Sequence, residues 1–172
     1  MQLPPLPADE KERIQDLYDL NLLDTEPEER FERYIRIARR TFNVPVAFIS
    51  LVDVKRQWFK ACEGLSISET SRDISFCAYT ILANQPLIVP DAYEDARFVN
   101  NSLVKGPPYI RFYAGNPLKG PHGHRVGSFC IVDFVPRQMD DANIKLLEDL
   151  AFLVSEEVNH TIGNNTILRK NE

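Results

Sequence analysis

Two neighbouring runs set the architecture of this chain: Ile110-Arg111-Phe112-Tyr113-Ala114-Gly115-Asn116-Pro117-Leu118 and, after a short connection, residues 125–134. Both runs are dominated by aromatic and β-branched residues and are closed by turn residues, which predicts two strands. The connection, residues 119–124, holds two glycines and a proline, so the two strands should form a hairpin with a loop of moderate length.

The two faces of the first predicted strand differ in chemistry. Side chains alternate along a strand, so Arg111 and Tyr113 should share one face, while Ile110, Phe112 and Ala114 share the other. The second of these faces is purely apolar, and we expect helices to seal it.

The face that carries the cation and the phenol has a different character. We expect Ser128 and Cys130 of the return strand to lie on it beside Tyr113. A mostly apolar surface with a few placed polar groups is typical of a cavity wall.

The composition is that of an ordinary globular domain. The 172 residues are 44% hydrophobic and 26% charged, with 20 Lys and Arg against 25 Asp and Glu. A chain of this length forms one domain and can bury a core without disulfides. The net charge of −5 and the absence of any basic run argue against a nucleic-acid surface, which needs clustered cations.

We expect a cytoplasmic protein. The longest apolar runs have the length of strands, so no segment should span a membrane. Residues 1–12 combine neither a basic region nor an apolar region, so we expect no signal peptide. The three cysteines, Cys62, Cys77 and Cys130, form no C-x-x-C motif and should be reduced and buried.

The residues before the hairpin predict two helices and several strands. One helix should begin near Asp9, capped by its carboxylate, and another at Thr25, where a capping hydroxyl is followed by Pro27 and Glu28. A strand over 46–53 is apolar on both faces, which implies layers on both sides of the sheet. The other expected elements are a strand over 57–62, a polar loop over 66–73, a short helix over 75–82, an edge strand over 86–89 and an irregular, lid-like loop over 91–108.

The last expected helix begins at Asp140 and carries two apolar stripes. The main stripe has the alternating spacing of three and four residues that is typical of a helix seam. A helix with two stripes needs two partners, which predicts packing against its own sheet and against a second copy, in a homodimer built from the terminal helices. We expect the helix to end at residues 163–165. The main stripe is Ile144, Leu147, Ala151, Val154 and Val158, and the second is Leu146, Leu150 and Leu153.

The order of these elements and a series of short motifs resemble the GAF domain family. The resemblance is to the sensor modules found at the N-terminus of bacterial diguanylate cyclases and histidine kinases, and it covers residues 12–160. The motifs are DTEPEERF (24–31), SFCAYTI (75–81), PLIVPDA (86–92), DARF (95–98), GPPYIRFYAG (106–115) and GSFCIVD (127–133).

The resemblance implies an α+β fold: a central antiparallel sheet of five to six strands, terminal helices on one face, and a small helix and loops forming a pocket on the other. The corresponding plan is a lead-in and N-terminal helix over 1–24, a GAF domain with its long C-terminal helix over 25–162, and a frayed tail over 163–172. The signatures of cyclic-nucleotide binding and bilin attachment are absent, so the ligand stays unidentified. No cyclase or kinase segment is expected after residue 160.

The expected ligand site combines the pocket wall with the short helix and the lid-like loop. Arg111 is the candidate anchor for an anionic or carbonyl ligand, because a guanidinium can donate two hydrogen bonds to a carboxylate. Alternatively, Arg111 pairs with Asp91 or Asp95 and holds the loop. The candidate ligand-binding residues are Phe76, Cys77, Thr80, Asp91, Arg97, Arg111, Tyr113, Ser128 and Cys130.

Two other groups of residues could carry chemistry. Cys77 and Cys130 could form a redox pair, as cysteines do in the free methionine-R-sulfoxide reductases, which share the GAF fold. Because Cys130 lies in an apolar strand, buried and inert thiols are the favoured interpretation. His122 and His124 could chelate a metal, but a solvated hairpin tip is favoured in the absence of further ligands nearby. We expect no metal site and no catalytic residues.

These features predict a non-catalytic sensory module in signal transduction, which binds a small molecule or a partner and relays the signal through the terminal helices of a dimer. Two alternatives stay open. One is a small cysteine-dependent redox enzyme that resembles free methionine-R-sulfoxide reductase. The other is a ligand-free dimerisation scaffold whose cavity is filled by Phe76, Tyr79, Phe98 and Tyr113.

Overall fold

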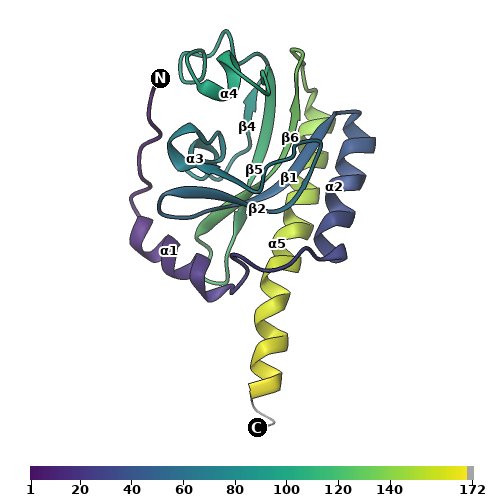
Figure 1. The fold of residues 1–172 in the computed structure, drawn as a ribbon. Helices are drawn as coiled ribbons and strands as arrows, with labels where there is room; N and C mark the ends of the chain where they lie inside the picture. Colours follow the sequence, from purple (N-terminus) through teal and green to yellow (C-terminus); the bar gives the residue numbers. More distant parts are fainter. Residues whose placement is uncertain (170–172) are drawn as a thin grey trace.

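A six-stranded antiparallel sheet forms the centre of the molecule (Figure 1). The structure is a computed structural model that describes the backbone of residues 1–169 and the side chains of residues 1–160. The strands lie in the order β3-β2-β1-β6-β5-β4, which confirms the predicted α+β architecture and the edge position of β4. The strands are β1 (Val46–Val52), β2 (Arg56–Glu63), β3 (Glu69–Ser71), β4 (Leu87–Val89), β5 (Phe112–Lys119) and β6 (Arg125–Asp133).

Helices cover both faces of this sheet (Figure 1). On one side, α2 (Glu29–Phe42) and α5 (Asp141–Arg169) pack on what we call the helix face. On the other, α3 (Cys77–Thr80) and α4 (Ser102–Lys105) cover what we call the pocket face, with a short 3-10 turn (Arg72–Ile74) before α3. Buried residues of the helix face include Phe31, Ile49, Phe112, Phe129 and Val154, and those of the pocket face include Phe48, Phe76, Phe98, Tyr113 and Cys130.

The predicted alternation along β5 is present from its first residue onward. Phe112 and Ala114 lie on the helix face, and Tyr113 lies on the pocket face. Ile110 was expected beside Phe112, but it packs on the pocket face. The regular strand begins only at Phe112, so strict alternation does not extend upstream to Ile110.

A glycine in β5 makes room for the side chain of Tyr113. A β-carbon at Gly115 would lie 2.2 Å from the Tyr113 hydroxyl oxygen, which is far inside van der Waals contact. Gly115 pairs with Cys130 in the neighbouring strand, so the ring of Tyr113 can extend over bare backbone toward that cysteine.

The first helix, α1 (Glu10–Asp19), is bound to the sheet by ion pairs and hydrogen bonds. Arg13 is fully buried, and its Nη1 donates to the carbonyl of Val52 at 2.7 Å. The Glu10 carboxylate pairs with Arg13 and also with Arg72, which comes from the segment before α3. This network holds α1 against the turn between β1 and β2.

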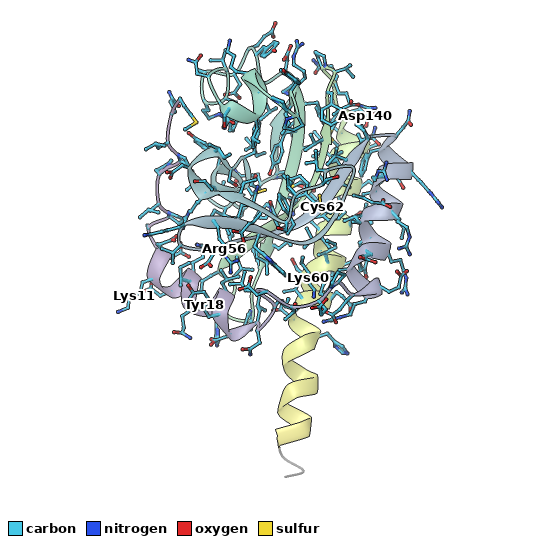
Figure 2. All side chains as sticks on the ribbon, in the orientation of Figure 1. Lys11, Tyr18, Arg56, Lys60, Cys62 and Asp140 are labelled. Carbon is cyan, nitrogen blue, oxygen red and sulfur yellow. The ribbon has the colours of Figure 1, made fainter. Side chains whose placement is uncertain are left out.

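The second helix begins three residues later than the sequence predicts, with Glu28 instead of Thr25 at its N-cap. Lys60 is the reason. Its buried ammonium donates to the Thr25 hydroxyl and to the Glu26 carbonyl, both at 2.7 Å, and pairs with Glu28 at 2.7 Å. Figure 2 shows Lys60 extending toward the segment that links α1 and α2. A long-range contact therefore takes the hydroxyl that would have capped the helix.

The long helix α5 starts where predicted but continues past its expected end. The Asp140 carboxylate accepts a hydrogen bond from the Asn143 amide at 2.8 Å and so caps the helix. Helical backbone then extends to Arg169, through the Gly163-Asn164-Asn165 sequence that was expected to end it. The last turns leave the body of the domain as a single helix (Figure 1). Residues 170–172 of the predicted tail lie outside the described residues.

Two other segments differ from expectation. The predicted loop over 66–73 contains the short edge strand β3, which pairs with β2. The predicted lid-like loop over 91–108 is largely irregular but contains α4, whose start is capped by the Asn101 side chain. In the part of the chain that the structure describes, no helix has the length and apolar character needed to cross a membrane.

Candidate functional site

Six hydroxyl and thiol groups meet between α3 and the centre of the sheet. The Tyr113 hydroxyl lies in the middle, 2.6 Å from Thr80 Oγ1, 3.4 Å from Cys77 Sγ and 3.2 Å from Cys130 Sγ. The two thiol sulfurs are 3.5 Å apart. We call this group the hydroxyl–thiol cluster; it comprises Ser50, Cys77, Thr80, Tyr113, Ser128 and Cys130.

The hydroxyl–thiol cluster is sealed from solvent, and its members satisfy one another. Ser128 Oγ lies 2.9 Å from Cys130 Sγ and 3.3 Å from Ser50 Oγ. All six side chains are at most 1% exposed. Buried polar groups need partners, and this cluster supplies them without any contribution from a charged side chain.

The two thiols of this cluster differ in acidity. Burial raises the pKa of Cys130 well above its ordinary value, and the neighbouring Cys77 raises it further. Burial also opposes ionisation of Cys77, but the polar groups around it, with the Cys130 thiol first and the Tyr113 hydroxyl among them, lower the pKa of this thiol to about 7. Because ionisation of one thiol raises the pKa of the other, the two thiols should not ionise together.

An apolar pocket lies beside the cluster on the pocket face. Its floor is formed by side chains from the sheet, and its cover comes from the β2–β3 connection and from residues in and after α4. The free space inside it is about 20 Å³, which is room for a single water molecule. The pocket is closed in this state. Its lining residues are Phe48, Gln57, Phe59, Leu65, Ile67, Thr70, Phe76, Leu103, Pro108, Ile110, Tyr113 and Val132.

One wall of the pocket has a polar side chain held in a fixed orientation. The Ser75 hydroxyl donates to Gln57 Oε1 at 2.7 Å, and Gln57 Nε2 donates to Thr70 Oγ1 at 3.1 Å. Ser75 also accepts a hydrogen bond from the Ala78 amide at the start of α3. The same hydroxyl thus orients Gln57 and caps the short helix.

The candidate ligand-binding residues fall into three groups. Phe76 and Tyr113 line the pocket. Cys77, Thr80, Ser128 and Cys130 belong to the hydroxyl–thiol cluster and do not line it. The charged residues Asp91, Arg97 and Arg111 lie outside both the pocket and the cluster.

Arg111 holds the loop that follows β4. Its Nε and Nη2 donate to the two carboxylate oxygens of Asp91 at 2.8 and 2.7 Å, and its guanidinium lies 4.1 Å from the centre of the Tyr93 ring. The hydrogen bonds from Arg111 lower the pKa of Asp91. The internal pair that the sequence suggested with Asp91 is therefore present.

Arg97 and the aromatic residues around it pack the 91–108 loop against α3. Arg97 donates to both carboxylate oxygens of Asp95, at 2.9 and 2.6 Å, and its guanidinium lies 5.2 Å from the centre of the Phe98 ring. Phe98 stacks on Phe76 with centroids 4.0 Å apart and planes 6° apart, and meets the edge of Tyr79 at 5.1 Å. These rings fill the space between α3 and the 91–108 loop.

The histidines of the hairpin connection contact α1, while the His122 side chain stays 69% exposed, as expected for a solvated tip. The Asp16 carboxylate is buried and accepts hydrogen bonds from the backbone amides of His122 and His124, at 3.0 and 3.1 Å. The His122 ring Nδ1 lies 2.9 Å from Asp16, and the His124 ring Nδ1 lies 2.6 Å from Asp9. Asp9, expected as a helix cap, makes no side-chain cap bond and binds this imidazole.

The same corner contains a group of possible metal ligands. Within the described side chains, donor atoms of Asp16, Asp19 and His122 lie within 4.8 Å of one another. The oxygens of Asp16 are already occupied by donors from the hairpin connection. This arrangement explains the group as a docking contact between α1 and the hairpin.

Sequence reasoning missed the polar residues Ser50, Gln57 and Thr70. A signal was available for the first two. Ser50 is the one polar residue in the buried strand β1, and Gln57 shares a strand face with Phe59 by alternation. Thr70 lies in the edge strand that the sequence did not predict.

Comparison with known proteins places this geometry in a family. The GAF domain profile matches residues 26–158. The chain is 42% identical over 163 residues to a cyclic di-GMP phosphodiesterase of Pseudomonas aeruginosa, and the match covers 94% of this chain. The chain spans 28% of the length of that relative.

Solved structures share the fold at low sequence identity. The GAF domain of a phosphoenolpyruvate-protein phosphotransferase from Coxiella burnetii has a TM-score of 0.68 and 11% identity, with 91% of this chain and 98% of that one covered. The free methionine-R-sulfoxide reductase of Neisseria meningitidis has a TM-score of 0.64 and 14% identity, with 96% and 99% covered. A domain of a putative sensor histidine kinase from Sinorhizobium meliloti has a TM-score of 0.61 and 18% identity, with 83% and 97% covered. The family profile and the shared fold agree, and this chain belongs to the GAF domain family.

Proposed function

We propose that this chain is a sensory, regulatory module of a signalling protein and has no catalytic role of its own. It is similar over nearly its whole length to one segment of a cyclic di-GMP phosphodiesterase, and it covers only 28% of that relative. Turnover of a cyclic dinucleotide is accordingly the candidate output that this module would control.

The observation that carries the proposal is the position of strand β5 between the pocket and the long helix. On the pocket face, β5 contributes Tyr113 to the pocket lining. On the helix face, Phe112 and Ala114 belong to the core in which Ala151 and Val154 of α5 are buried. A displacement of β5 by a pocket occupant would therefore be felt directly by α5.

Hydrogen bonds at the end of β5 strengthen this link. The backbone amide of Lys119 donates to Ser155 Oγ of α5 at 3.2 Å, and the Lys119 carbonyl accepts from Asn159 Nδ2 at 3.0 Å. Packed elements move as units, because dense interiors do not deform continuously. We infer that α5 follows β5 and carries the signal out of the domain along its last turns.

The ligand we propose is small and largely apolar. The pocket lining is aromatic and aliphatic apart from Gln57, Thr70 and the Tyr113 hydroxyl. The closed state has no room for more than a water-sized molecule, so a ligand must displace the cover. Leu65, Ile67 and Leu103 are the side chains of the cover that would move, because the first two lie on the β2–β3 connection and the third on the four-residue helix α4, outside the sheet.

We further propose that α5 pairs with α5 of a second copy. Phe152 and Leu153 are 64% and 47% exposed on the side of α5 that faces away from the sheet. The main stripe and Leu150 are buried or partly buried against the domain itself, so they are not available to a partner. The exposed pair is the surface that fits a helix–helix contact between copies.

The pocket proposal is tested by titrating the purified chain with N-phenyl-1-naphthylamine, an uncharged probe that fluoresces in apolar sites. The wild type should bind it, and Leu103→Trp, which fills the pocket from α4, should weaken binding by a factor of about 10 or more. Ser102→Trp is the matched control, because Ser102 is exposed on the same helix and does not line the pocket. Equal binding by wild type and Leu103→Trp, or no binding by either, would support the ligand-free scaffold instead.

A second candidate function, a thiol redox enzyme, is favoured by the 3.5 Å separation of Cys77 and Cys130 and by the shared fold with a methionine sulfoxide reductase. Both thiols are fully buried, which opposes a substrate as large as methionine sulfoxide. We expect no reduction of free methionine sulfoxide with dithiothreitol as the reductant. Turnover that disappears in Cys77→Ser or Cys130→Ser would establish the enzyme.

A further inference from the structure

Cys77 and Cys130 are brought together by two elements of very different extent. Cys130 lies near the centre of β6, a nine-residue strand paired on both sides. Cys77 is the first residue of α3, a helix of four residues that covers the pocket face. The sulfurs are 3.5 Å apart, and the Tyr113 hydroxyl contacts both of them.

We propose that Cys77 and Cys130 form a reversible disulfide when the protein meets hydrogen peroxide, and that this pair is a redox modification site separate from the ligand pocket. A disulfide requires the sulfurs to approach to about 2.05 Å, so the present distance must shorten by about 1.5 Å. The short helix α3 can supply this movement, whereas β6 is fixed by its neighbours.

The order of attack follows from the environments of the two thiols. Cys77 is on the four-residue helix α3, which can move away from the sheet, whereas Cys130 is near the centre of a strand that is paired on both sides. Hydrogen bonds within the cluster also lower the pKa of Cys77 against the effect of burial. The thiolate is the nucleophile toward peroxide, so Cys77 attacks first and Cys130 resolves. Both sulfurs are buried and lie outside the pocket, so peroxide reaches them when α3 moves away from the sheet.

The chemistry balances with peroxide as the oxidant. The Cys77 sulfur attacks one peroxide oxygen, the O–O bond breaks, and the departing hydroxide takes the thiol proton and leaves as water. The Cys130 sulfur then attacks the sulfenic sulfur of Cys77, the S–O bond breaks, and a second water leaves with the Cys130 proton. Two thiols lose two electrons in total, and one peroxide is reduced to two waters.

The consequence would be a fixed pocket wall. A covalent bond between α3 and β6 would hold α3 against the sheet together with its N-cap residue Phe76, which is both a pocket wall and the partner of Phe98 in the aromatic stack. Oxidation should therefore restrict movement of this wall without adding any ligand.

Cys62 provides an internal control in the same chain. It is only partly buried, and its thiol donates to the Leu65 carbonyl at 3.8 Å. Burial raises the pKa of Cys62 to about 11, so it holds little thiolate near neutral pH. A selective reaction of the buried pair is thus distinguishable from general oxidation of accessible thiols.

The test is to treat the full chain with a graded series of hydrogen peroxide concentrations, remove the peroxide with catalase, and count free thiols by alkylation in denaturant and mass spectrometry. We expect two of the three thiols to be lost, a peptide that links Cys77 to Cys130, and recovery of both thiols with dithiothreitol. Persistence of both thiols at concentrations that oxidise Cys62, or a disulfide between two chains, would overturn the proposal.

Variants and a structural readout sharpen this test. Cys62→Ser should still lose two thiols, whereas Cys77→Ala and Cys130→Ala should form no intramolecular disulfide. If either buried variant fails to fold, the linked Cys77–Cys130 peptide of the wild type is sufficient to decide the proposal. Amide hydrogen exchange in α3 should slow in the oxidised chain, and unchanged exchange despite a confirmed disulfide would overturn the fixing of this pocket wall. Because binding of the apolar probe is measured on reduced protein, failure of this proposal leaves the pocket proposal intact.

Discussion

The helix face and the pocket face of the same sheet are built differently. Under α2 and α5, the buried cluster is made of aliphatic and aromatic residues. Under α3 and α4, the buried cluster surrounds six hydroxyl and thiol groups and a closed pocket. The first face gains its stability from apolar burial, whereas the second includes polar groups that are stable only while they satisfy one another. A surface of the second kind can respond to a ligand, because small displacements change its hydrogen bonds.

The largest loss of stability should come from a substitution on the helix face. Phe112 is fully buried between β5 and the helices, and Phe112→Ala should lower the free energy of unfolding by about 3–5 kcal/mol through lost burial and a cavity. Urea denaturation followed by circular dichroism measures it. A loss below about 1 kcal/mol would mean that this face does not hold the main core.

The ion pairs of α1 give a second, pH-dependent contribution. Burial raises the pKa of Glu10, but hydrogen bonds from Arg72 and Arg13 outweigh it and lower the pKa to about 2, against an ordinary value of 4.5. A depressed carboxyl pKa stabilises the fold above pH 4.5, and this stabilisation is lost as the pH falls toward 2. The contribution is on the order of 3 kcal/mol.

Urea titrations between pH 7 and pH 2 measure the contribution of the Glu10 ion pairs to the free energy of unfolding. Glu10→Gln should lose stability at neutral pH and show a shallower decline in acid than the wild type. Glu12→Gln is the matched control, because Glu12 is exposed on the same helix. Parallel pH profiles for Glu10→Gln and the wild type would contradict the role of these ion pairs.

A substitution at Tyr113, the residue after Phe112, tests the pocket face. Tyr113→Phe keeps the ring but removes the hydroxyl that contacts Thr80, Cys77 and Cys130. Each of these buried groups would lose one of its hydrogen-bond partners, which should lower the free energy of unfolding by about 1–3 kcal/mol. A stability equal to that of the wild type in urea denaturation would show that the hydroxyl–thiol cluster does not depend on Tyr113.

Arg111, which precedes Phe112 and Tyr113 in the sequence, lies outside the pocket. Arg111→Ala removes a bidentate but partly exposed ion pair with Asp91, so we expect only a small loss of stability. The main result should be faster limited proteolysis of the 91–105 segment, which Arg111 holds through Asp91. Arg111→Lys should show an intermediate rate. A rate unchanged in Arg111→Ala would mean that other contacts hold this loop.

The smallest effect on stability should come from the exposed side of α5. Phe152→Glu combined with Leu153→Glu should change the free energy of unfolding by no more than about 0.5 kcal/mol, because both side chains are exposed. The same change should convert a dimer to a monomer in sedimentation analysis at tens of micromolar, an order of magnitude typical of transient contacts. Lys105→Glu, on the opposite face, should stay dimeric. A monomeric wild type would remove the proposed pairing.

The stripe pattern alone would suggest substitutions at Leu150 and Val154 to test for a dimer, but the structure excludes them as tests. Leu150 and Val154 belong to the two predicted stripes, but both are buried against the domain. Glutamate at either position would unfold the core and would say nothing about a dimer.

Local patterns predicted the sheet, the two-sided packing and the facing of Tyr113 toward Cys130, because alternation and helical periodicity depend on neighbouring residues alone. They failed where a distant residue competes. Thr25 does not cap α2 because Lys60 binds its hydroxyl, and Asp9 does not cap α1 because His124 binds its carboxylate. The pairing of Ser50 with Ser128 likewise depends on strand register, which a single strand does not reveal.

The proposed link between the two faces is tested most directly by amide hydrogen exchange of the reduced chain with and without N-phenyl-1-naphthylamine. If β5 couples the pocket to α5, the probe should change exchange at the pocket cover, along β5 and in residues 144–158 of α5, while α1 stays unchanged. Changes confined to the pocket cover, with α5 unaffected at saturating probe, would contradict the coupling.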